Sequence, residues 1–355
     1  MAENTIRINA GKGYDVAVGR GLVSKCGEMI GKTLGDCRVA VITDSNVEKF
    51  CLPPVLDSLH AAGVEAVHCA FPAGEQSKRI STLSDMLEFL ADMRFTRKDA
   101  VVALGGGVTG DMAGFAAGCY MRGIRYIQMP TTLLAAVDSS VGGKTAIDLA
   151  AGKNLAGLFI QPESVICDTR FLSTLPALFF ADGEAEAIKT GVLMGGELFS
   201  IFEHGDAAAD IDDVVKMCVR YKGTVVEEDE FETGARKALN LGHTVGHAIE
   251  LLSGYTVHHG HAVAAGTAVM ARASARLGYG SREAATRIEN ALLRAGLPTV
   301  TDYSADELAE AAMADKKRTG DDITIVMPEE IGRCVLMSVP IRELSGIIGA
   351  GTEAL

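Results

Sequence analysis

The residues best suited to chemistry in this 355-residue sequence are concentrated in a histidine cluster. Five of the eight histidines fall within 19 residues, namely His243, His247, His258, His259 and His261. Clusters of this kind are typical of metal sites and of acid/base catalysis. His243 and His247 stand four residues apart in LGHTVGHAIE, so a helix would place both rings on one face. The spacing leaves three interpretations open: two metal ligands, one ligand with one acid/base residue, or a solvated polar face.

A third, anionic ligand is available in the segment AEAIKTG. It places Glu184, Glu186 and Lys189 in otherwise apolar surroundings, and a helix would put Glu186 and Lys189 on one face. One interpretation is a surface ion pair. The other is a carboxylate ligand beside a lysine that meets an anion. Two histidines and one carboxylate form a catalytic set for zinc or a similar divalent ion.

The charge balance restricts the class of ligand. Lys and Arg number 33 against 46 Asp and Glu, a net charge of −13, which opposes binding to nucleic acids and anionic membranes. Any anionic ligand must therefore meet a local group of cations. Each candidate cation taken alone is expected at the surface, but together they indicate a phosphate-bearing substrate. The candidates in Gly-rich or polar contexts are Arg122, Lys144, Lys153, Lys222, Arg236, Lys316 and Lys317.

A glycine-rich segment suggests a dinucleotide site. GGGVTGD at residues 105–111 follows the apolar run AVVAL, and its glycines match G-x-G-x-x-G in the setting that this motif requires. A plain tight turn between a strand and a helix is the alternative. Asp44 ends another apolar run, and Glu75 and Lys78 lie in the loop FPAGEQSK. Such polar groups at strand ends favour the dinucleotide interpretation, because ribose hydroxyls are held there.

The order of elements predicts the fold. Short β-rich runs alternate with helical segments in the first half, as in a parallel sheet covered on both faces, and long Ala-, Leu- and Glu-rich runs follow from about Leu175. We therefore expect an α/β Rossmann-like parallel-sheet domain over residues 1–172 and a mainly α-helical domain over residues 173–355. The expected strands lie at 38–43, 64–71, 100–104, 124–130 and 163–169, and the expected helices include 81–93, 262–277 and 281–295.

The cysteines and the first residues bear on the compartment. The eight cysteines are scattered without a C-x-x-C pair and are expected to be reduced thiols of the core. The first residues show no basic segment followed by an apolar run, and no stretch approaches the roughly 18 apolar residues of a membrane span. We expect a cytoplasmic protein that binds neither membranes nor nucleic acids.

Eight ordered segments, which span nearly the full length, resemble 3-dehydroquinate synthases, a family of sugar-phosphate cyclases. The segments are GGGVTGDMAGFAAGCYMRG, IQMPTTLLAAVDSSVGGKTAID, AGKNLAGLFIQP, DTRFLSTLP, AEAIKTG, EEDEFETGARKALNLGHTVGHAIE, HHGHAVAAG and DKKRTG. The resemblance implies a cytoplasmic homodimer of the shikimate pathway that uses NAD and one divalent metal, zinc or cobalt. The implied reaction turns 3-deoxy-D-arabino-heptulosonate 7-phosphate into 3-dehydroquinate and phosphate. Transient oxidation by NAD, phosphate elimination, re-reduction, ring opening and aldol closure are its steps.

The same resemblance implies roles for individual residues. The implied metal ligands are Glu186, His243 and His259. Catalytic or positioning roles fall to His247, Glu232, Lys189, Lys144, Arg236 and Asn240. The substrate would contact Arg122, Asp138, Lys144, Asn154, Lys222, Arg236, Asn240 and one or both of Lys316 and Lys317. NAD would contact Asp44, Glu75, Lys78, Gly105, Gly106, Gly107, Asp111, Thr131, Thr132, Lys144, Lys153, Phe171 and Thr174.

Two segments depart from the family pattern. TLP is usually followed shortly by an Arg-Glu pair but here by ALFFADG, and the usual HGE is here His259-Gly260-His261. His258 and His261 therefore compete with His259 as third ligand. Alternatives to the implied reaction are another sugar-phosphate cyclase and a metal-dependent NAD polyol dehydrogenase, with a non-enzymatic binding protein last. A dehydrogenase would have no use for the set of cations.

Overall fold

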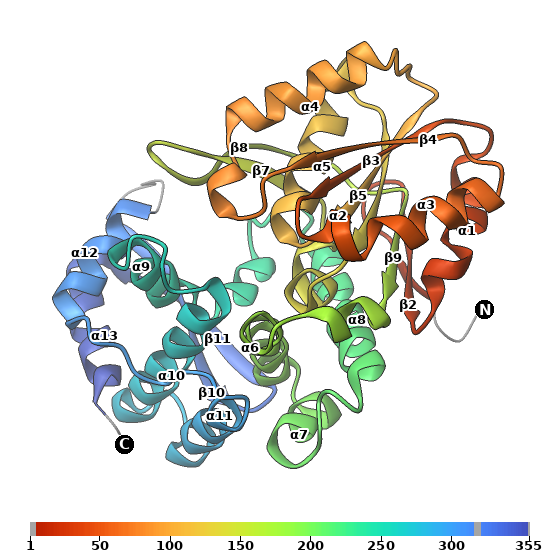
Figure 1. Cartoon of the computed structure of the whole chain (residues 1–355). Helices are drawn as coiled ribbons and strands as arrows, with labels where there is room; N and C mark the ends of the chain where they lie inside the picture. The colour runs from red at the N-terminus through yellow and green to blue at the C-terminus, as the bar shows by residue number, and fades with distance from the viewer. Residues whose placement is uncertain (1–4, 316–320, 354–355) are drawn as a thin grey trace. The chain divides into compact units, whose positions relative to one another are not determined.

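The computed structural model describes residues 5–315 and 321–353, which divide into two compact units. Unit 1 comprises the chain up to Pro176 together with Lys222–Phe231. Unit 2 comprises Ala177–Tyr221 and the chain from Glu232 onward. Figure 1 labels the elements of both units. The predicted order, a parallel-sheet domain followed by a mainly helical one, is confirmed.

Unit 1 is built on a seven-stranded sheet in the order β1-β2-β9-β6-β5-β3-β4. All neighbouring strands run parallel except β1, which is antiparallel to β2. The five strands predicted from apolar runs are all present in this sheet. Its members are β1 (Thr5–Ile8), β2 (Tyr14–Gly19), β3 (Val39–Asp44), β4 (Ala66–Phe71), β5 (Ala100–Gly105), β6 (Arg125–Pro130) and β9 (Ser164–Asp168).

Helices cover both faces of the sheet because side chains alternate along each strand. Val39 and Val41 pack with α1 and α3, whereas Ala40 and Ile42 pack with α4 and α5 (Figure 1). Helical segments of unit 1 are η2 (Leu22–Lys25), α1 (Cys26–Leu34), α2 (Val47–Phe50), α3 (Leu52–Ala61), η3 (Glu75–Ser77), α4 (Ile80–Asp92), α5 (Gly107–Cys119), η4 (Tyr120–Arg122), η5 (Ala135–Ser139) and η6 (Thr169–Thr174).

The sheet changes its winding direction at β3. The chain passes from β3 to β4 on one side and returns to β5 on the other, so the carboxyl ends of β3 and β5 border a topological switch point. Ligands of open α/β sheets bind at such points. A separate hairpin of β7 (Lys144–Leu149) and β8 (Gly152–Phe159) was not predicted from the sequence.

Unit 2 is organised around α10, which packs against α6, α9, α11 and α13. Small residues allow these helices to pack closely. A Cβ on Gly266 of α10, for example, would lie 2.1 Å from the carbonyl oxygen of Gly242, which precedes α9. Elements of unit 2 are α6 (Ala177–Met194), α7 (Gly196–His204), η7 (Ala235–Asn240), α9 (His243–Leu252), α10 (His259–Leu277), α11 (Arg282–Arg294), α12 (Ala305–Asp315), β10 (Asp322–Glu330), β11 (Arg333–Pro340), η8 (Ile341–Glu343) and α13 (Leu344–Thr352). Helix α8 (Ile211–Glu228) begins in unit 2, and its residues from Lys222 belong to unit 1.

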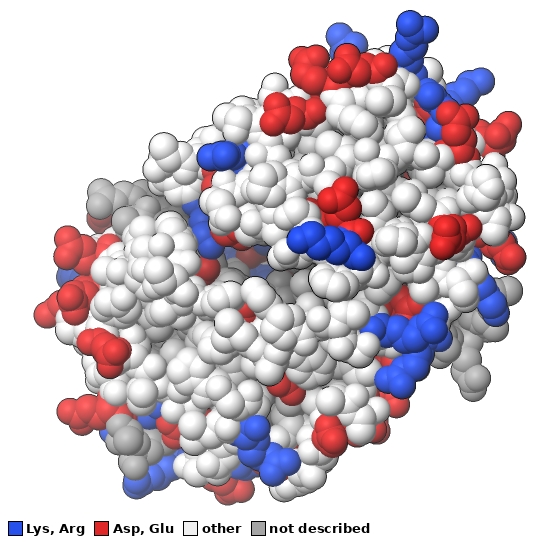
Figure 2. Space-filling model, viewed as in Figure 1, with Lys and Arg blue, Asp and Glu red and all other residues white. Residues whose placement is uncertain are grey.

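The remaining features concern the surface and the cysteines. Acidic and basic side chains are interspersed on the face drawn in Figure 2. All eight cysteines lie within the described ranges as free thiols; four are buried, but Cys119 is exposed, so not every one is a core thiol. No helix in the described part of the chain is both long and apolar enough to span a membrane.

Candidate functional site

Three helices of unit 2 bring Glu186, His243 and His259 together. Glu186 lies on α6, His243 begins α9 and His259 begins α10. Glu186 Oε1 is 3.6 Å from Nε2 of His243 and 3.4 Å from Nε2 of His259. One ligand atom from each of the three residues lies within 4.8 Å of the others. The separation is small enough for a single ion to contact all three residues.

Neighbouring groups orient both imidazoles. Nδ1 of His243 lies 3.2 Å from the carbonyl oxygen of Leu241, which can only accept a hydrogen bond, so the proton belongs on Nδ1. Nδ1 of His259 lies 3.1 Å from the buried carboxylate of Glu250. In both rings Nε2 is left to face Glu186. Metal-binding histidines usually donate the ring N–H that does not face the metal to a carboxylate or a backbone carbonyl oxygen, and both rings have such a partner here.

The electrostatics of the group are strongly coupled. Burial favours the neutral form of Glu186, but the Lys189 ammonium and His243 outweigh it and hold its pKa well below the ordinary value. Burial and Lys189 lower the pKa of His243 well below the ordinary value. Burial also disfavours the charged form of His259, yet Glu186 and Glu250 raise its pKa to about 10. The carboxylate is therefore ionised, as a metal ligand must be.

The donor set fits a divalent ion. Glu186 is 1% exposed, and among the described residues neither of its oxygens accepts a hydrogen bond of good geometry. A buried carboxylate in that state needs a partner beyond the adjacent Lys189. Two imidazoles and one carboxylate, with coordination positions left for substrate, are characteristic of catalytic zinc sites.

His247 is close to the same group but belongs to a second set. Its ring centroid lies 5.3 Å from that of His243 and 5.9 Å from that of His259. His247, Glu250 and His259 also hold ligand atoms within 4.8 Å of one another. The two sets overlap at His259, so the geometry leaves open whether His247 is a ligand or an acid/base residue.

His258 and His261 face a different carboxylate. Nδ1 of His258 lies 3.2 Å from Asp182 Oδ2, and Nδ1 of His261 lies 2.7 Å from Asp182 Oδ1. Neither joins a potential metal-ligand group within the described ranges. Asp182 and Glu250 were not singled out in the sequence. The only signal was an acidic residue at an otherwise apolar helical position.

Several of the predicted anion-binding cations are buried. The cations expected singly at the surface include Lys222 and Arg236, which are 8% and 2% exposed, and Lys189 of α6 is 2% exposed. For Lys222 and Arg236 the surface expectation is wrong, whereas Lys144 is exposed. In unit 2, the predicted residue Asn240 donates to Glu232 Oε1 at 2.7 Å. Burial of a cation in an acidic protein points to a specific anionic partner.

In unit 1, the predicted residues meet in two places. Lys222 Nζ donates to the carbonyl oxygen and to Oδ1 of Asp138, at 2.7 and 2.8 Å. Asp138 lies on η5, a π-helical turn, and such turns often mark functional sites. Lys78 Nζ, 5% exposed, contacts Asp111 Oδ2 and Asn154 Oδ1, each at 2.6 Å. In this second place, the substrate candidate Asn154 and the NAD candidates Lys78 and Asp111 therefore belong to one network.

Most of the other NAD candidates follow the carboxyl ends of the parallel strands, and those after β3 and β5 border the switch point. Asp44 Oδ1 accepts the N–H groups of Asn46 and Val47, and the Thr109 hydroxyl lies 3.4 Å from Asp44 Oδ2. Thr131 follows β6, and its hydroxyl is buried without a partner among the described residues. A Cβ on Gly105 would lie 2.4 Å from the Thr109 hydroxyl, so this glycine is needed for the turn itself. The remaining candidates include Glu75 with Lys153, paired at 3.5 Å, Gly106, Gly107, Thr132, buried Phe171 and exposed Thr174.

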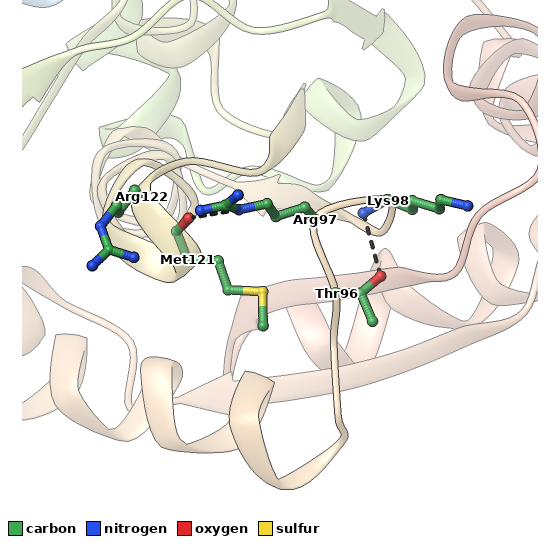
Figure 3. A pocket seen from close by; sticks show the side chains of 5 residues that line it. All are labelled: Thr96, Arg97, Lys98, Met121 and Arg122. Carbon is green, nitrogen blue, oxygen red and sulfur yellow. Dashed lines mark hydrogen bonds between the residues drawn. The ribbon is translucent and has the colours of Figure 1, made fainter.

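Arg122 lies apart from the other candidates of unit 1. It precedes β6 and lines a depression with Thr96, Arg97, Lys98 and Met121, drawn in Figure 3. These residues lie at the amino-terminal edge of the sheet, whereas the switch point lies at the carboxyl edge. Six-residue strands at about 3.3 Å per residue separate the two edges by about 17 Å. Lys316 and Lys317 lie outside the described residues.

Comparison with known proteins gives consistent matches along the chain. Family models described as 3-dehydroquinate synthase N-terminal and C-terminal match residues 68–182 and 183–318. A 3-dehydroquinate synthase of Clostridium acetobutylicum is 40% identical over 336 residues, covering 93% of this chain and 94% of that protein. One of Caulobacter vibrioides is 44% identical over 344 residues, covering 92% and 93%. A crystal structure of 2-deoxy-scyllo-inosose synthase with carbaglucose-6-phosphate, NAD+ and Co2+ superposes with a TM-score of 0.88 at 26% identity, covering 98% of this chain and 100% of that one.

Proposed function

The chain belongs to the 3-dehydroquinate synthase family, and on that premise we propose that it converts 3-deoxy-D-arabino-heptulosonate 7-phosphate into 3-dehydroquinate and phosphate. The reaction makes it a carbon–oxygen lyase of the shikimate pathway, working in the cytoplasm. The observation that carries the proposal is the convergence of Glu186, His243 and His259 from three helices. These are the ligands that the resemblance implies.

Glu186, His243 and His259 would hold zinc or cobalt, and NAD would bind at the carboxyl ends of β3 and β5. When bound, the ion would polarise a secondary alcohol of the substrate, and NAD would reversibly accept a hydride from the carbon that carries this alcohol. The ring centroid of His247 lies 5.3 Å from that of His243 and 5.9 Å from that of His259. Its imidazole is therefore suited to move a proton at the reacting carbon. Lys189, beside Glu186, places a positive charge where an alcohol oxygen becomes anionic.

The cations would bind the two anionic groups of the substrate. Lys222, buried against Asp138, and buried Arg236 supply charge that water screens only weakly. We assign them, with Lys144, Asn154, Asn240 and one or both of Lys316 and Lys317, to the phosphate and carboxylate. Glu232, bonded to Asn240, orients that amide. In this proposal, unit 1 holds NAD and unit 2 holds the metal.

Most of the NAD residues of the proposal follow the carboxyl ends of the parallel strands, with the switch point between β3 and β5 at the centre of the proposed site. Asp44 is suited to accept ribose hydroxyls, and the amides that start α5, from Gly107, are suited to bind the pyrophosphate. Thr131 offers a buried hydroxyl to the cofactor. The further contacts proposed are Glu75, Lys78, Gly105, Gly106, Asp111, Thr132, Lys144, Lys153, Phe171 and Thr174.

In a homodimer, Arg122 of one subunit would serve the substrate site of the other. Within its own unit, Arg122 lies at the sheet edge opposite the switch point, so we propose that it contacts substrate held by the partner subunit. Mixing Arg122→Ala with His243→Ala, each inactive alone, should restore activity, because a mixed dimer contains one intact site. If mixed dimers form and stay inactive, Arg122 does not act across the dimer; light scattering reports whether a dimer exists.

The test of the reaction is phosphate release from the heptulosonate phosphate with NAD and Zn2+ or Co2+ present, followed together with product absorbance. Turnover with this substrate but not with glucose 6-phosphate supports the proposal. Turnover with glucose 6-phosphate alone would indicate another sugar-phosphate cyclase, and stoichiometric NADH formation with a polyol would indicate a dehydrogenase.

A further inference from the structure

A second histidine group lies beside the proposed metal ligands, with Asp182 at its centre. The Asp182 carboxylate lies on α6 and faces both rings. Its Oδ2 is 3.2 Å from Nδ1 of His258, and its Oδ1 is 2.7 Å from Nδ1 of His261. Its side chain is 9% exposed. We call Asp182, His258 and His261 the Asp182 clamp.

The clamp fixes the start of α10. The residue before this helix, His258, makes no side-chain capping bond. Instead Asp182 Oδ1 accepts the backbone N–H of His261 at 3.1 Å, one of the amides that a helix start leaves without an intrahelical partner. A carboxylate at this end of a 19-residue helix is also favoured by the helix dipole. Asp182 therefore caps α10 from a neighbouring helix.

The turn that the clamp holds is the turn that carries His259. On α6, Asp182 and Glu186 stand four residues apart and share one face. On α10, His259 lies against Glu186, with Nε2 3.4 Å from Oε1, while His258 and His261 lie against Asp182. Between them, a Cβ on Gly260 would lie 2.2 Å from the Asp182 carbonyl oxygen, so the two backbones are in direct contact. The Asp182 clamp and the Glu186–His259 contact therefore lie on the same pair of helices and the same first turn of α10.

The clamp also joins the two segments in which this chain departs from the family pattern. Asp182 belongs to ALFFADG, and His261 replaces the usual glutamate of HGE. A second contact links the same segments: the rings of Phe179 and His258 meet edge to face, with centroids 5.0 Å apart. The Asp182 carboxylate and the His258 and His261 rings therefore join these two segments directly.

We propose that Asp182, held between His258 and His261, is a positioning residue for the metal ligand His259. The inference rests on the proposed function, because it takes Glu186, His243 and His259 as the ligands. Groups that orient metal ligands typically change metal affinity by about 10- to 100-fold when removed. We expect the clamp to act on metal affinity and only through it on turnover.

The test is a titration of the full-length protein with Co2+, followed by its visible absorption bands, which report affinity and ligand geometry. Asp182→Ala should raise the Kd for Co2+ about 10-fold or more and alter the bands. The matched control is Glu203→Ala, which breaks a two-bond ion pair with Arg287 in the same unit, at 2.7 Å for each bond, away from the ligands. Its Kd should equal that of the unaltered protein.

A charge exchange makes the test specific to the clamp. His261→Glu restores the family residue but sets it against the Asp182 carboxylate, so we expect a weaker Kd than for His261→Ala; adding Asp182→Asn should recover much of the loss. Unchanged Co2+ binding in folded Asp182→Ala would overturn the inference. If Asp182→Ala does not fold, unchanged binding in both Asp182→Asn and His261→Ala would overturn it equally. Failure of the unaltered protein to bind Co2+, or unchanged binding in His259→Ala, would refute the ligand assignment instead.

Discussion

Three single substitutions should separate the two overlapping sets of candidate ligands. His259 belongs to both sets, so its removal takes one donor from each. His243 belongs only to the set with Glu186, and His247 only to the set with Glu250. The expected order of lost metal affinity is therefore His259→Ala, then His243→Ala, then His247→Ala.

The size of the effect follows from the number of ligands. Structural zinc sites with four protein ligands bind with about 10–16 kcal/mol, or about 2.5–4 kcal/mol for each ligand. At about 1.4 kcal/mol for each factor of ten, His243→Ala should weaken binding by about two to three orders of magnitude. His259→Ala should weaken it further. His247→Ala should keep affinity within about tenfold while kcat falls by about 10²- to 10⁴-fold, as for a lost acid/base group.

The assay is competition for Zn2+ against a chromophoric chelator, with kcat measured separately at saturating metal. His204→Ala is the matched control, because its side chain is 76% exposed on α7 of the same unit. If His247→Ala loses affinity by orders of magnitude and His243→Ala does not, the ion is bound by the set with Glu250. Full metal occupancy and undiminished activity in His243→Ala would refute the assignment altogether.

Three further predictions concern the anion site, the cofactor and stability. Arg236→Ala should lower kcat/KM by about 10- to 100-fold, from about 1.5–3 kcal/mol for a charge-assisted contact, while the metal content stays unchanged. Because Arg236 is buried, the melting temperature is measured alongside to separate a loss of the contact from a loss of folding. Half-buried Lys237→Ala is the control, and wild-type kcat/KM in Arg236→Ala would contradict the anion-site argument. Phosphate release should require NAD without accumulating NADH at steady state, and the absorbance of the reduced nicotinamide checks this. Arg272→Ala should reduce the free energy of unfolding by about 3–5 kcal/mol in urea titrations, because Arg272 is 0% exposed and binds Glu289 and the carbonyl oxygens of Thr299 and Gly351. Exposed Arg276→Ala, on the same helix, should cost under about 1 kcal/mol.

The sheet of unit 1 was largely predictable because its central strands are buried on both faces and read as continuous apolar runs. The two hairpins were not. In β7 and β8 polar residues interrupt the pattern, and exposed Lys144 begins the first of them. The hairpin of β10 and β11 lies in a half whose helical periodicity dominates, and its short connection around Gly332 was not recognised as a turn.

For the candidate site, the sequence indicated which residue types could meet but not their partners. The spacing of His243 and His247 predicted a shared face within one helix. The opposing groups come from elsewhere: Glu186 from α6 and His259 from α10, whose close packing depends on small residues distant in sequence. Asp182 was missed for the same reason, because its partners His258 and His261 are 76 and 79 residues away.

Burial, which the sequence could not show, changes the argument about the cations. Lys189 and Lys222 are each paired with a carboxylate, of Glu186 and Asp138. Replacing a buried ion pair by apolar residues is often neutral or stabilising, so stability alone gives little reason to bury such pairs. A substrate with two anionic groups does give one, because it meets a charge that is already desolvated and only weakly screened.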